Sequence, residues 1–184
     1  MSPQDECEPT EIMAYPQELS LPQELFLDED PQVPNNPVLP VLLYRGVLSP
    51  QTQGKDRIFE TRFAGNGWRG IWRNGIFGYH HFHPDAHEAL GIASGSVSVQ
   101  LGGDSGERIS LSAGDLVVLP AGTGHRNVAA SDDLLVIGAY PGGQENVSTS
   151  RAKMERTAMA DVALPESDPF YGKDGPLAQL WRSA

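Results

Sequence analysis

The sequence predicts a mainly β fold, and three observations indicate it. Short apolar runs recur about every ten residues, as in "EALGIASG", "SVSVQLGG", "RISLSAGD", "LVVLPAG" and "LLVIGAYPGG". Glycine-containing turns separate these runs, and only two short stretches have helical character. Several short strands at such a spacing are typical of an antiparallel sandwich or barrel.

The overall composition limits the kind of protein. A chain of 184 residues provides one domain with a substantial core. Its formal net charge of −11 repels phosphate backbones, so we expect no nucleic-acid partner. The one cysteine, Cys7, allows no internal disulfide, and the first residues lack the basic and apolar parts of a secretion signal. Because the apolar runs are too short to span a bilayer, we expect a soluble, cytoplasmic protein without a membrane partner.

The chain divides into three predicted segments. Residues 1–37 are rich in proline and acidic side chains, and we expect an irregular arm because proline resists helices and central strands. Residues 38–145 form the predicted β domain, which begins with "VLPVLLYRG" as a strand. Residues 146–184 form a tail that we expect to pack on the domain or on a partner subunit, because its aromatic and leucine side chains need cover.

Two stretches have helical character. Phe59 and Phe63 lie four residues apart, which predicts a helix that Gly65 and Gly67 end. A second helical piece is predicted near residues 150–160.

Four of the five histidines lie in "GYHHFHPDAHE". In an extended segment His81 and His83 share a face, since side chains alternate across a strand. A turn at Pro84 brings the chain back, and Glu88 shares an inward face with the apolar residues two and four positions later. Two imidazoles and a carboxylate inside an apolar wall indicate a divalent cation, because buried unpaired polar groups are unfavourable.

The fifth histidine, His125, is a further candidate ligand. It follows a strand, a proline and a glycine-rich turn in "GDLVVLPAGTGHRNV". Such a turn lets the backbone approach closely and directs the next side chain inward.

These two stretches resemble the paired motifs of the cupin superfamily. The first motif is Gly, five residues, His-x-His, three or four residues, Glu, six residues and Gly. Every interval is matched, by Gly75, His81, His83, Glu88 and Gly95.

The second cupin motif is Gly, five residues, Pro-x-Gly, two residues, His, three residues and Asn. It is matched at Gly114, Pro120, Gly122 and His125. Ala129 stands where the family has Asn, and Asn127 lies two positions earlier, which weakens the local turn assignment more than the metal site.

A looser resemblance, to the YjlB-like group of single-domain cupins, covers about residues 34–181 in "PNNPVLPVLLYRG", "NGWRGIWRNGI", "HEALGIASG" and "DPFYGKDGPL". The resemblance implies the cupin double-stranded β-helix, a jelly-roll barrel, with short helical additions at both ends. It implies His81, His83, Glu88 and His125 as the metal ligands, and it does not imply a particular reaction.

The positions of the other two histidines, His80 and His87, are predicted from the alternation of side chains along a strand. His87 lies on the face opposite Glu88, which predicts that it faces solvent or a subunit contact. As an alternative, His87 replaces Glu88 as the ligand. By the same parity His80 is expected at the surface or at an interface.

Several other side chains lie near the predicted site. Phe77 is expected to be core packing. Tyr79 is the candidate for a substrate contact and a general base, since a buried hydroxyl needs a partner. Trp68 and Trp72 are expected to anchor the core or an interface. Arg69 and Arg73 either bind a substrate carboxylate or face water.

The predicted ligand set determines the functional hypothesis. Three imidazoles and one carboxylate on an octahedral ion leave about two positions open. We therefore expect a metal-dependent enzyme acting on a small oxygenated metabolite, by a dioxygenase-like or an isomerase, decarboxylase or lyase reaction. The ligand set suits Fe, Mn, Ni, Zn or Cu and does not choose among them.

Two alternatives stay open. One is a binding or sensor cupin whose metal anchors a small-molecule ligand without catalysis, and the other is a metal with a structural role only. The resemblance to small cupins also implies a homodimer, for which the "VLPVLLY" strand and the tail are the candidate contacts.

Overall fold

The computed structural model describes residues 21–184. Within them lie the strands β1 (Gln23–Leu25), β2 (Val41–Tyr44), β3 (Trp68–Asn74), β4 (Glu88–Ser94), β5 (Ser96–Leu101), β6 (Glu107–Ser112), β7 (Leu116–Leu119), β8 (His125–Ala130) and β9 (Leu135–Pro141). The helices are α1 (Lys55–Gly65), the short 3-10 turn η1 (Arg156–Met159) and α2 (Pro176–Leu180).

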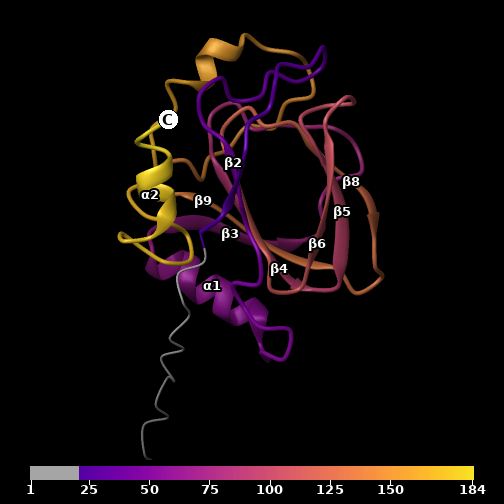
Figure 1. Ribbon diagram of the computed structural model, residues 1–184, viewed down its shortest axis with the longest axis vertical. Coiled ribbons are helices and arrows are strands. Elements are labelled where there is room, and N and C mark those ends of the chain that lie inside the picture. Colours follow the sequence, from indigo (N-terminus) through magenta and orange to yellow (C-terminus); the bar gives the residue numbers. More distant parts are fainter. Residues whose placement is uncertain (1–20) are drawn as a thin grey trace, which may run out of the picture.

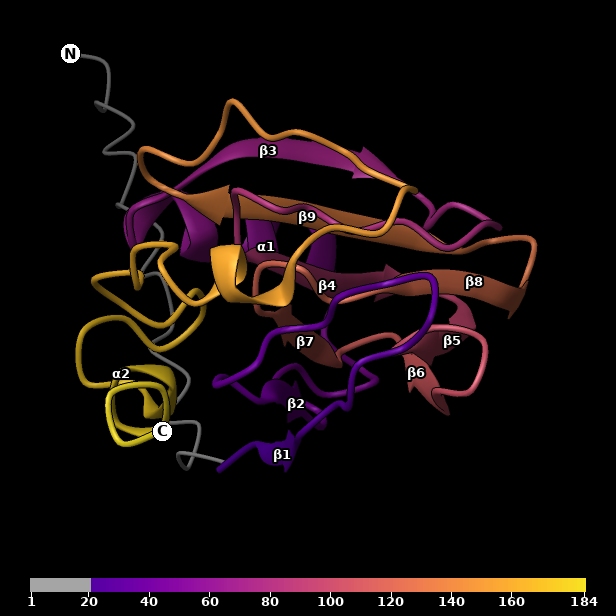
Figure 2. The ribbon, with the colours of Figure 1, turned by 90° about the horizontal axis from the view of Figure 1, so that it is seen from above.

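The strands form two antiparallel sheets that face each other. The larger sheet has the order β1-β2-β7-β4-β9-β3, and the smaller one has the order β6-β5-β8. Figure 1 looks between the two sheets, and Figure 2 shows the strands of the larger sheet one after another. The predicted mainly β class is confirmed.

Strand β4 shows how the sequence pattern builds two cores. Leu90 and Ile92 point between the sheets, where they join Val97 and Val99 of β5 in one apolar cluster. Ala89 belongs to a second cluster on the opposite face of the larger sheet. This alternation follows from the period of two in a strand, and it confirms that Glu88, Leu90 and Ile92 share an inward face.

Helix α1 covers the outer face of the larger sheet. Phe59 and Phe63 are fully buried there, and their rings lie 5.7 Å apart. The helix ends at Gly65, where the backbone N–H of Asn66 donates to the carbonyl of Arg62. The helix predicted from the spacing of the two phenylalanines is confirmed.

The C-terminal residues lie on the same outer face, beside α1 (Figure 1, yellow). Phe170, Leu177 and Trp181 are buried in the outer cluster. The Trp181 indole N–H donates to the carbonyl of Pro40 at 3.0 Å. The outer face of the larger sheet is therefore a second core, made by α1 and the tail together. The predicted segment boundaries themselves stay predictions.

Three details differ from the sequence-based expectations. Residues 75–83 do not form a strand, and their pairing is limited to the bridges His81–His125 and Phe82–Ser150. Part of the proline-rich segment, β1, pairs with β2. Strand β2 also pairs with β7, so it lies inside the larger sheet, and its candidate role in a dimer contact stays a prediction. The first 20 residues of the predicted arm lie outside the described residues.

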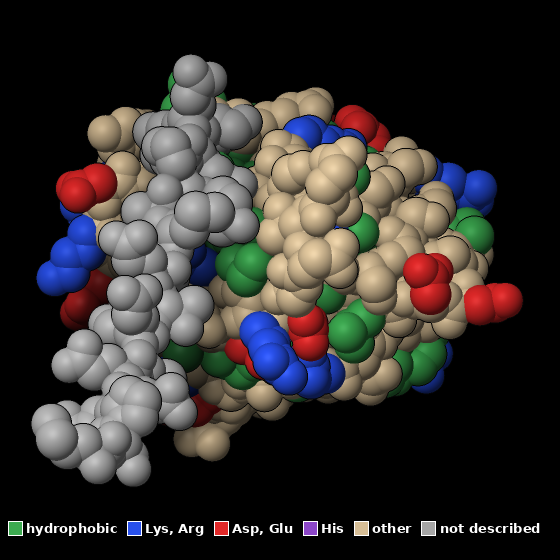
Figure 3. Space-filling model, turned by 90° about the horizontal axis from the view of Figure 1, so that it is seen from below, with side chains coloured by type: hydrophobic (Ala, Val, Ile, Leu, Met, Phe, Trp, Pro, Cys, Tyr) green, Lys and Arg blue, Asp and Glu red, His purple; other side chains and the backbone are tan. Residues whose placement is uncertain are grey.

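In the described part of the chain, no helix has the length and apolar character needed to cross a membrane. On the face shown in Figure 3, Lys, Arg, Asp and Glu side chains of the described residues lie close to one another. Among the described residues visible on that face, charges of one sign form no large patch.

Candidate metal centre

His81 and His125 are held opposite each other by the backbone. The N–H of His81 donates to the carbonyl of His125 at 3.2 Å, and the N–H of His125 donates back to the carbonyl of His81 at 3.0 Å. Residues that exchange both hydrogen bonds stand directly across an antiparallel pair, so their side chains are neighbours. The two imidazole rings lie 4.1 Å apart. One bridge thus joins the two predicted motifs.

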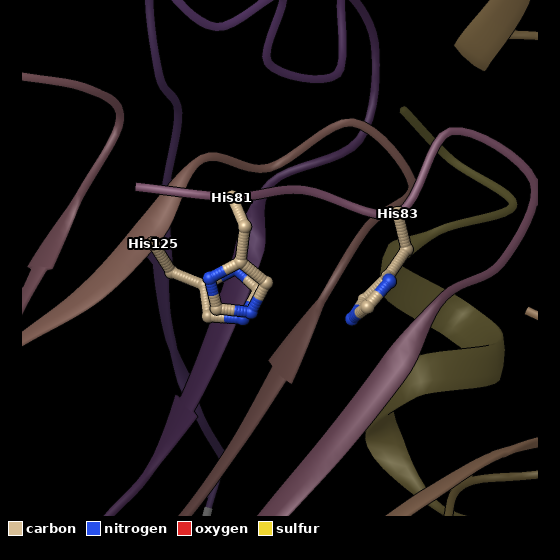
Figure 4. Close-up of side chains that lie close together, drawn as sticks. All are labelled: His81, His83 and His125. Atoms are coloured by element: carbon tan, nitrogen blue, oxygen red, sulfur yellow. The ribbon is translucent and has the colours of Figure 1, made fainter. Parts of the chain in front are cut away.

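His83 comes from the same segment as His81, two residues further on. The Phe82 between them exchanges hydrogen bonds with Ser150 at 3.0 and 2.9 Å. One ring nitrogen from each of His81, His83 and His125 lies within 4.8 Å of the others, and all three residues are buried. Figure 4 shows the three imidazoles directed into a common space.

Each of the three imidazoles is oriented by a backbone carbonyl. Their Nδ1 atoms lie 3.2, 2.9 and 2.9 Å from the carbonyl oxygens of Tyr79, Ser148 and Thr123, in the order His81, His83, His125. A carbonyl only accepts, so in the neutral imidazole Nδ1 carries the proton and Nε2 presents a lone pair. An N–H held by a backbone carbonyl is the usual arrangement for a histidine that binds a metal through its other nitrogen.

Glu88 supplies a carboxylate to the same space. It begins β4 and is only 3% exposed. Its Oε1 lies 3.4 Å from Nε2 of His83, and its Oε2 lies 3.4 Å from Nε2 of His125. Oε2 has no hydrogen-bond partner among the described residues. A buried carboxylate oxygen without a donor is unfavourable unless a cation is present.

The charges of these groups depend on one another. Burial favours the neutral form of Glu88, but the neighbouring imidazoles of His125 and His83 outweigh it and hold the pKa of the carboxyl well below its usual range. Burial lowers the pKa of His81 to about 3, with a contribution from His125. Burial also opposes protonation of His83, yet the hydrogen bond and charge of Glu88 raise its pKa. Glu88 therefore stays ionised beside the imidazoles, and this buried negative charge favours a bound cation.

The donor set fits a divalent metal ion. Ligand atoms of a single ion with bonds of about 2.1 Å lie about 3 Å apart in an octahedron. The two 3.4 Å separations between Glu88 and the imidazoles are close to this value. Three nitrogen ligands and one anionic oxygen suit a divalent transition metal.

A cavity of about 250 Å³ adjoins the four residues. Its other lining side chains include Trp72, Phe77, Leu90, Tyr140 and Thr149. The indole N–H of Trp72 donates to the hydroxyl of Tyr140 at 3.1 Å. Phe77 is 50% exposed at this cavity, so the prediction that it is core packing is wrong. The reason is that residues 75–79 lie between β3 and β4 and belong to no strand.

Tyr140, and not Tyr79, is the phenol that lines this cavity. Tyr79 stacks on Phe77 at 5.0 Å and lines a neighbouring cavity instead. This placement does not favour the role in chemistry that the sequence predicts for Tyr79.

His87 lies on the face opposite Glu88, as alternation predicts, but that face is not solvent or a subunit contact. His87 is fully buried, and its ring lies 4.8 Å from that of Trp181. Its Nδ1 accepts a hydrogen bond from the backbone N–H of Ala121 at 3.0 Å. The prediction failed because the tail covers this side of β4. His87 is not among the grouped histidines.

The remaining candidates lie elsewhere. His80 is buried, contrary to the predicted surface position. Arg73 pairs with Asp56 and Glu60 of α1, and Arg69 donates to the carbonyls of Ala64 and Trp68. Neither arginine lines the cavity beside the histidines.

Sequence reasoning missed two contributors to the site. Tyr140 lies four residues after Val136, which points between the sheets, so alternation along "VIGAY" could have placed it inside. The carbonyl of Ser148, which orients His83, has no signal in the sequence, because backbone groups are the same in every residue.

Comparison with known proteins identifies the family to which the chain belongs. A family model described as "Cupin domain" matches residues 71–137. The uncharacterised protein YjlB of Bacillus subtilis is 37% identical over 163 residues, which are 86% of this chain and 96% of YjlB. The chain belongs to the cupin superfamily and is YjlB-like. The resemblance noted from the two motifs is confirmed.

Several solved structures match parts of this chain. Acireductone dioxygenase from Bacillus anthracis, with cadmium in its active centre, is 20% identical over 54% of this chain and 76% of its own, with a TM-score of 0.36. A mutant of oxalate decarboxylase from Bacillus subtilis is 16% identical over 69% of this chain, with a TM-score of 0.34. This cupin spans 30% of that decarboxylase and 21% of the procruciferin from Brassica napus that also matches. Such values carry no argument about the reaction.

Proposed function

We propose that this cupin is a metal-dependent enzyme that acts on a small oxygenated metabolite. The observation that carries the proposal is the buried group of His81, His83, His125 and Glu88 beside a cavity of about 250 Å³. A site with no adjoining space would suit a structural metal, whereas this one leaves room for a small molecule next to the ligands.

The cavity favours a particular class of substrate. None of the described residues that line it is Lys or Arg, so a substrate anion finds no side-chain counter-ion there. Besides the four candidate ligands, its lining includes the aromatic side chains of Trp72, Phe77 and Tyr140. A flat, weakly charged molecule with two neighbouring oxygens, such as an enol or a diketone, fits this combination of wall and donor set.

Tyr140 is the side chain best placed to handle a proton. Burial and the Glu88 carboxylate raise the pKa of its phenol, so the hydroxyl stays protonated at neutral pH. The Trp72 indole donates to the phenol oxygen and fixes its position. A fixed, protonated phenol at the cavity wall can donate a hydrogen bond or a proton to a bound oxygenated substrate. A bound divalent metal would supply Lewis acidity and, if redox-active, reactivity toward oxygen.

The first test is elemental analysis of the protein as purified. We expect a divalent transition metal in a near-stoichiometric amount, and its loss from His81→Ala and Glu88→Ala. A metal-free wild-type protein that also takes up no metal on titration would overturn the proposal.

The second test addresses catalysis. Protein loaded with Fe(II) is mixed with a panel of enols, diketones and sugar acids, and oxygen consumption and product formation are followed. Oxygen uptake supports a dioxygenase-like reaction, and product without oxygen uptake supports an isomerase, decarboxylase or lyase reaction. Tight binding of one panel member without turnover would instead identify a binding cupin.

The same substrate panel allows a matched comparison of the phenols of Tyr140 and Tyr79. We expect Tyr140→Phe to lower turnover about 10² to 10⁴-fold with unchanged metal content. Tyr79→Phe is the control and should keep wild-type turnover, because Tyr79 does not line the cavity. Equal losses in both variants would contradict the assignment to Tyr140.

A further inference from the structure

A second cavity of about 250 Å³ lies on the other side of the segment that carries His81. The residues that matter for its chemistry are Gln32, Tyr79, His80, Asp104, Arg126 and Arg151. We call it the His80 pocket. It shares none of its lining residues with the cavity beside the metal centre.

His80 indicates that this pocket takes a ligand. The side chain is 6% exposed, and neither ring nitrogen has a hydrogen-bond partner among the described residues. Its Nε2 lies 3.6 Å from Oδ1 of Asp104, which is beyond hydrogen-bond distance. A buried imidazole with two unpartnered nitrogens is unfavourable, so a polar group in the pocket would stabilise it.

Two arginines give the pocket positive charge in an acidic protein. Arg126 directs Nε and Nη2 to Oε1 of Gln100 at 3.0 and 2.8 Å, and several of its five N–H donors remain. The guanidinium of Arg151 stacks over the Tyr79 ring at 4.4 Å. Stacking uses the flat face and leaves the N–H edge for a ligand. Within residues 21–184, Arg151 forms no ion pair.

The acidic groups near His80 already have donors. Asp104 lies at the rim, where its Oδ2 accepts from the Gln32 side chain at 2.8 Å and its Oδ1 lies 3.6 Å from Arg126. Asp30 accepts from the backbone N–H of Gln32 at 2.9 Å and from the hydroxyl of Ser105 at 2.8 Å. Two guanidinium groups therefore face the pocket, and Asp104 is the one carboxylate among its described lining residues.

We propose that the His80 pocket binds a small oxyanion, a carboxylate or a phosphate. The edges of Arg126 and Arg151 would hold the anion by charge-assisted hydrogen bonds. The ring N–H of neutral His80 would donate a further hydrogen bond and gain the partner that it lacks. The volume of about 250 Å³ suits a small molecule of this class.

Isothermal titration calorimetry on the full chain tests this proposal, with inorganic phosphate and with acetate as separate probes. We expect saturable binding of at least one probe, and which of them binds distinguishes phosphate from carboxylate. Arg151→Gln and Arg126→Gln should each weaken binding about 10-fold, because a charge-assisted hydrogen bond is lost. Arg57→Gln, an exposed arginine on α1, is the matched control and should bind as the wild type does.

The metal content of each variant is measured as well, to show whether a loss of anion binding comes from the His80 pocket or from loss of metal. An oxyanion that binds the metal instead would keep its affinity in Arg151→Gln and lose it in His81→Ala. That outcome, or no heat from either probe, would overturn the proposal. Arg151 is exposed, so its variant should fold even if Arg126→Gln does not, and circular dichroism checks this.

Discussion

Three histidines of one segment show that the role of a residue depends on where its side chain points more than on its neighbours in the sequence. His81 directs Nε2 into the metal centre, while His80, one position earlier, is buried in a different cavity. His87 precedes Glu88 directly but packs on Trp181 beyond the sheet. Alternation along the chain separates these environments.

At the residue scale, Glu88 should dominate metal affinity. Glu88→Gln keeps the shape of the side chain and removes its charge. We expect affinity for Zn²⁺ to fall by more than about 100-fold. This loss is larger than is usual when a residue that only hydrogen-bonds to a metal ligand is removed. Competition titration with a chromophoric chelator measures it.

Glu107→Gln is the matched control for this prediction, because Glu107 is an exposed carboxylate on β6. It should leave Zn²⁺ affinity unchanged. Equal affinity in Glu88→Gln and wild type would show that the carboxylate is not a ligand.

Gly138 determines the position of Trp72. It stands opposite Trp72 in the pairing of β3 with β9, and a Cβ at this position would lie 2.0 Å from the indole ring. Gly138→Ala should therefore displace the indole, break its hydrogen bond to Tyr140 and lower the free energy of unfolding by about 1–3 kcal/mol. Urea unfolding followed by tryptophan fluorescence measures both effects.

Gly65→Ala serves as the control for Gly138→Ala, because a Cβ at Gly65 meets no atom within 4 Å. It should leave the fluorescence spectrum unchanged. A Gly138→Ala variant with wild-type stability and spectrum would contradict the packing described for Trp72.

At the scale of elements, Asp168 connects the tail to the larger sheet. Its carboxylate accepts from the Tyr44 hydroxyl of β2 at 2.5 Å. It also accepts from the backbone N–H groups of Phe170, Tyr171 and Leu177. A buried carboxylate with four donors fixes the tail over α1 and β2, and the tail then covers His87.

The Tyr44–Asp168 contact predicts a loss of stability in alkali. Burial and the Asp168 charge raise the pKa of the Tyr44 phenol above its ordinary value. The native state therefore holds this proton after the unfolded state has lost it, so the stabilisation is complete below about pH 10 and falls above it. Tyr140 acts in the same direction. Urea unfolding between pH 7 and pH 11 measures this slope.

Tyr44→Phe should reduce that slope and lower the free energy of unfolding at pH 7 by about 1–2 kcal/mol, because Asp168 loses a donor. Tyr79→Phe, a partly exposed phenol, is the control. An alkaline slope unchanged in Tyr44→Phe would refute the assignment to this pair.

At the scale of the whole molecule, two apolar cores share the larger sheet. One lies between the sheets and ends at the metal centre, and the other lies under α1 and the tail. Within residues 21–184, the edge strands are β1 and β3 in the larger sheet and β6 and β8 in the smaller one. Leu21 and Phe26, on either side of β1, are largely exposed.

The homodimer stays a prediction, and the edge at β1 is the place to test it. An exposed strand edge with apolar flanks favours association. We expect a dimer in sedimentation equilibrium at micromolar concentration and a weaker one in Phe26→Lys. Leu164→Lys, which changes an exposed apolar residue away from this edge, should leave the dimer intact. A wild-type chain that is monomeric at every concentration would contradict the prediction.

The sequence by itself determined the mainly β class, helix α1, the inward face of β4 and the residues that converge as the candidate metal centre. It could do so because alternation, helical spacing and the two motif intervals are local properties of the chain. Only the tertiary structure decided the surroundings of His80 and His87, the exposure of Phe77 and the contribution of Ser148 to the site. These depend on segments far apart in sequence that cover one another, and no local pattern encodes which face a distant tail will cover.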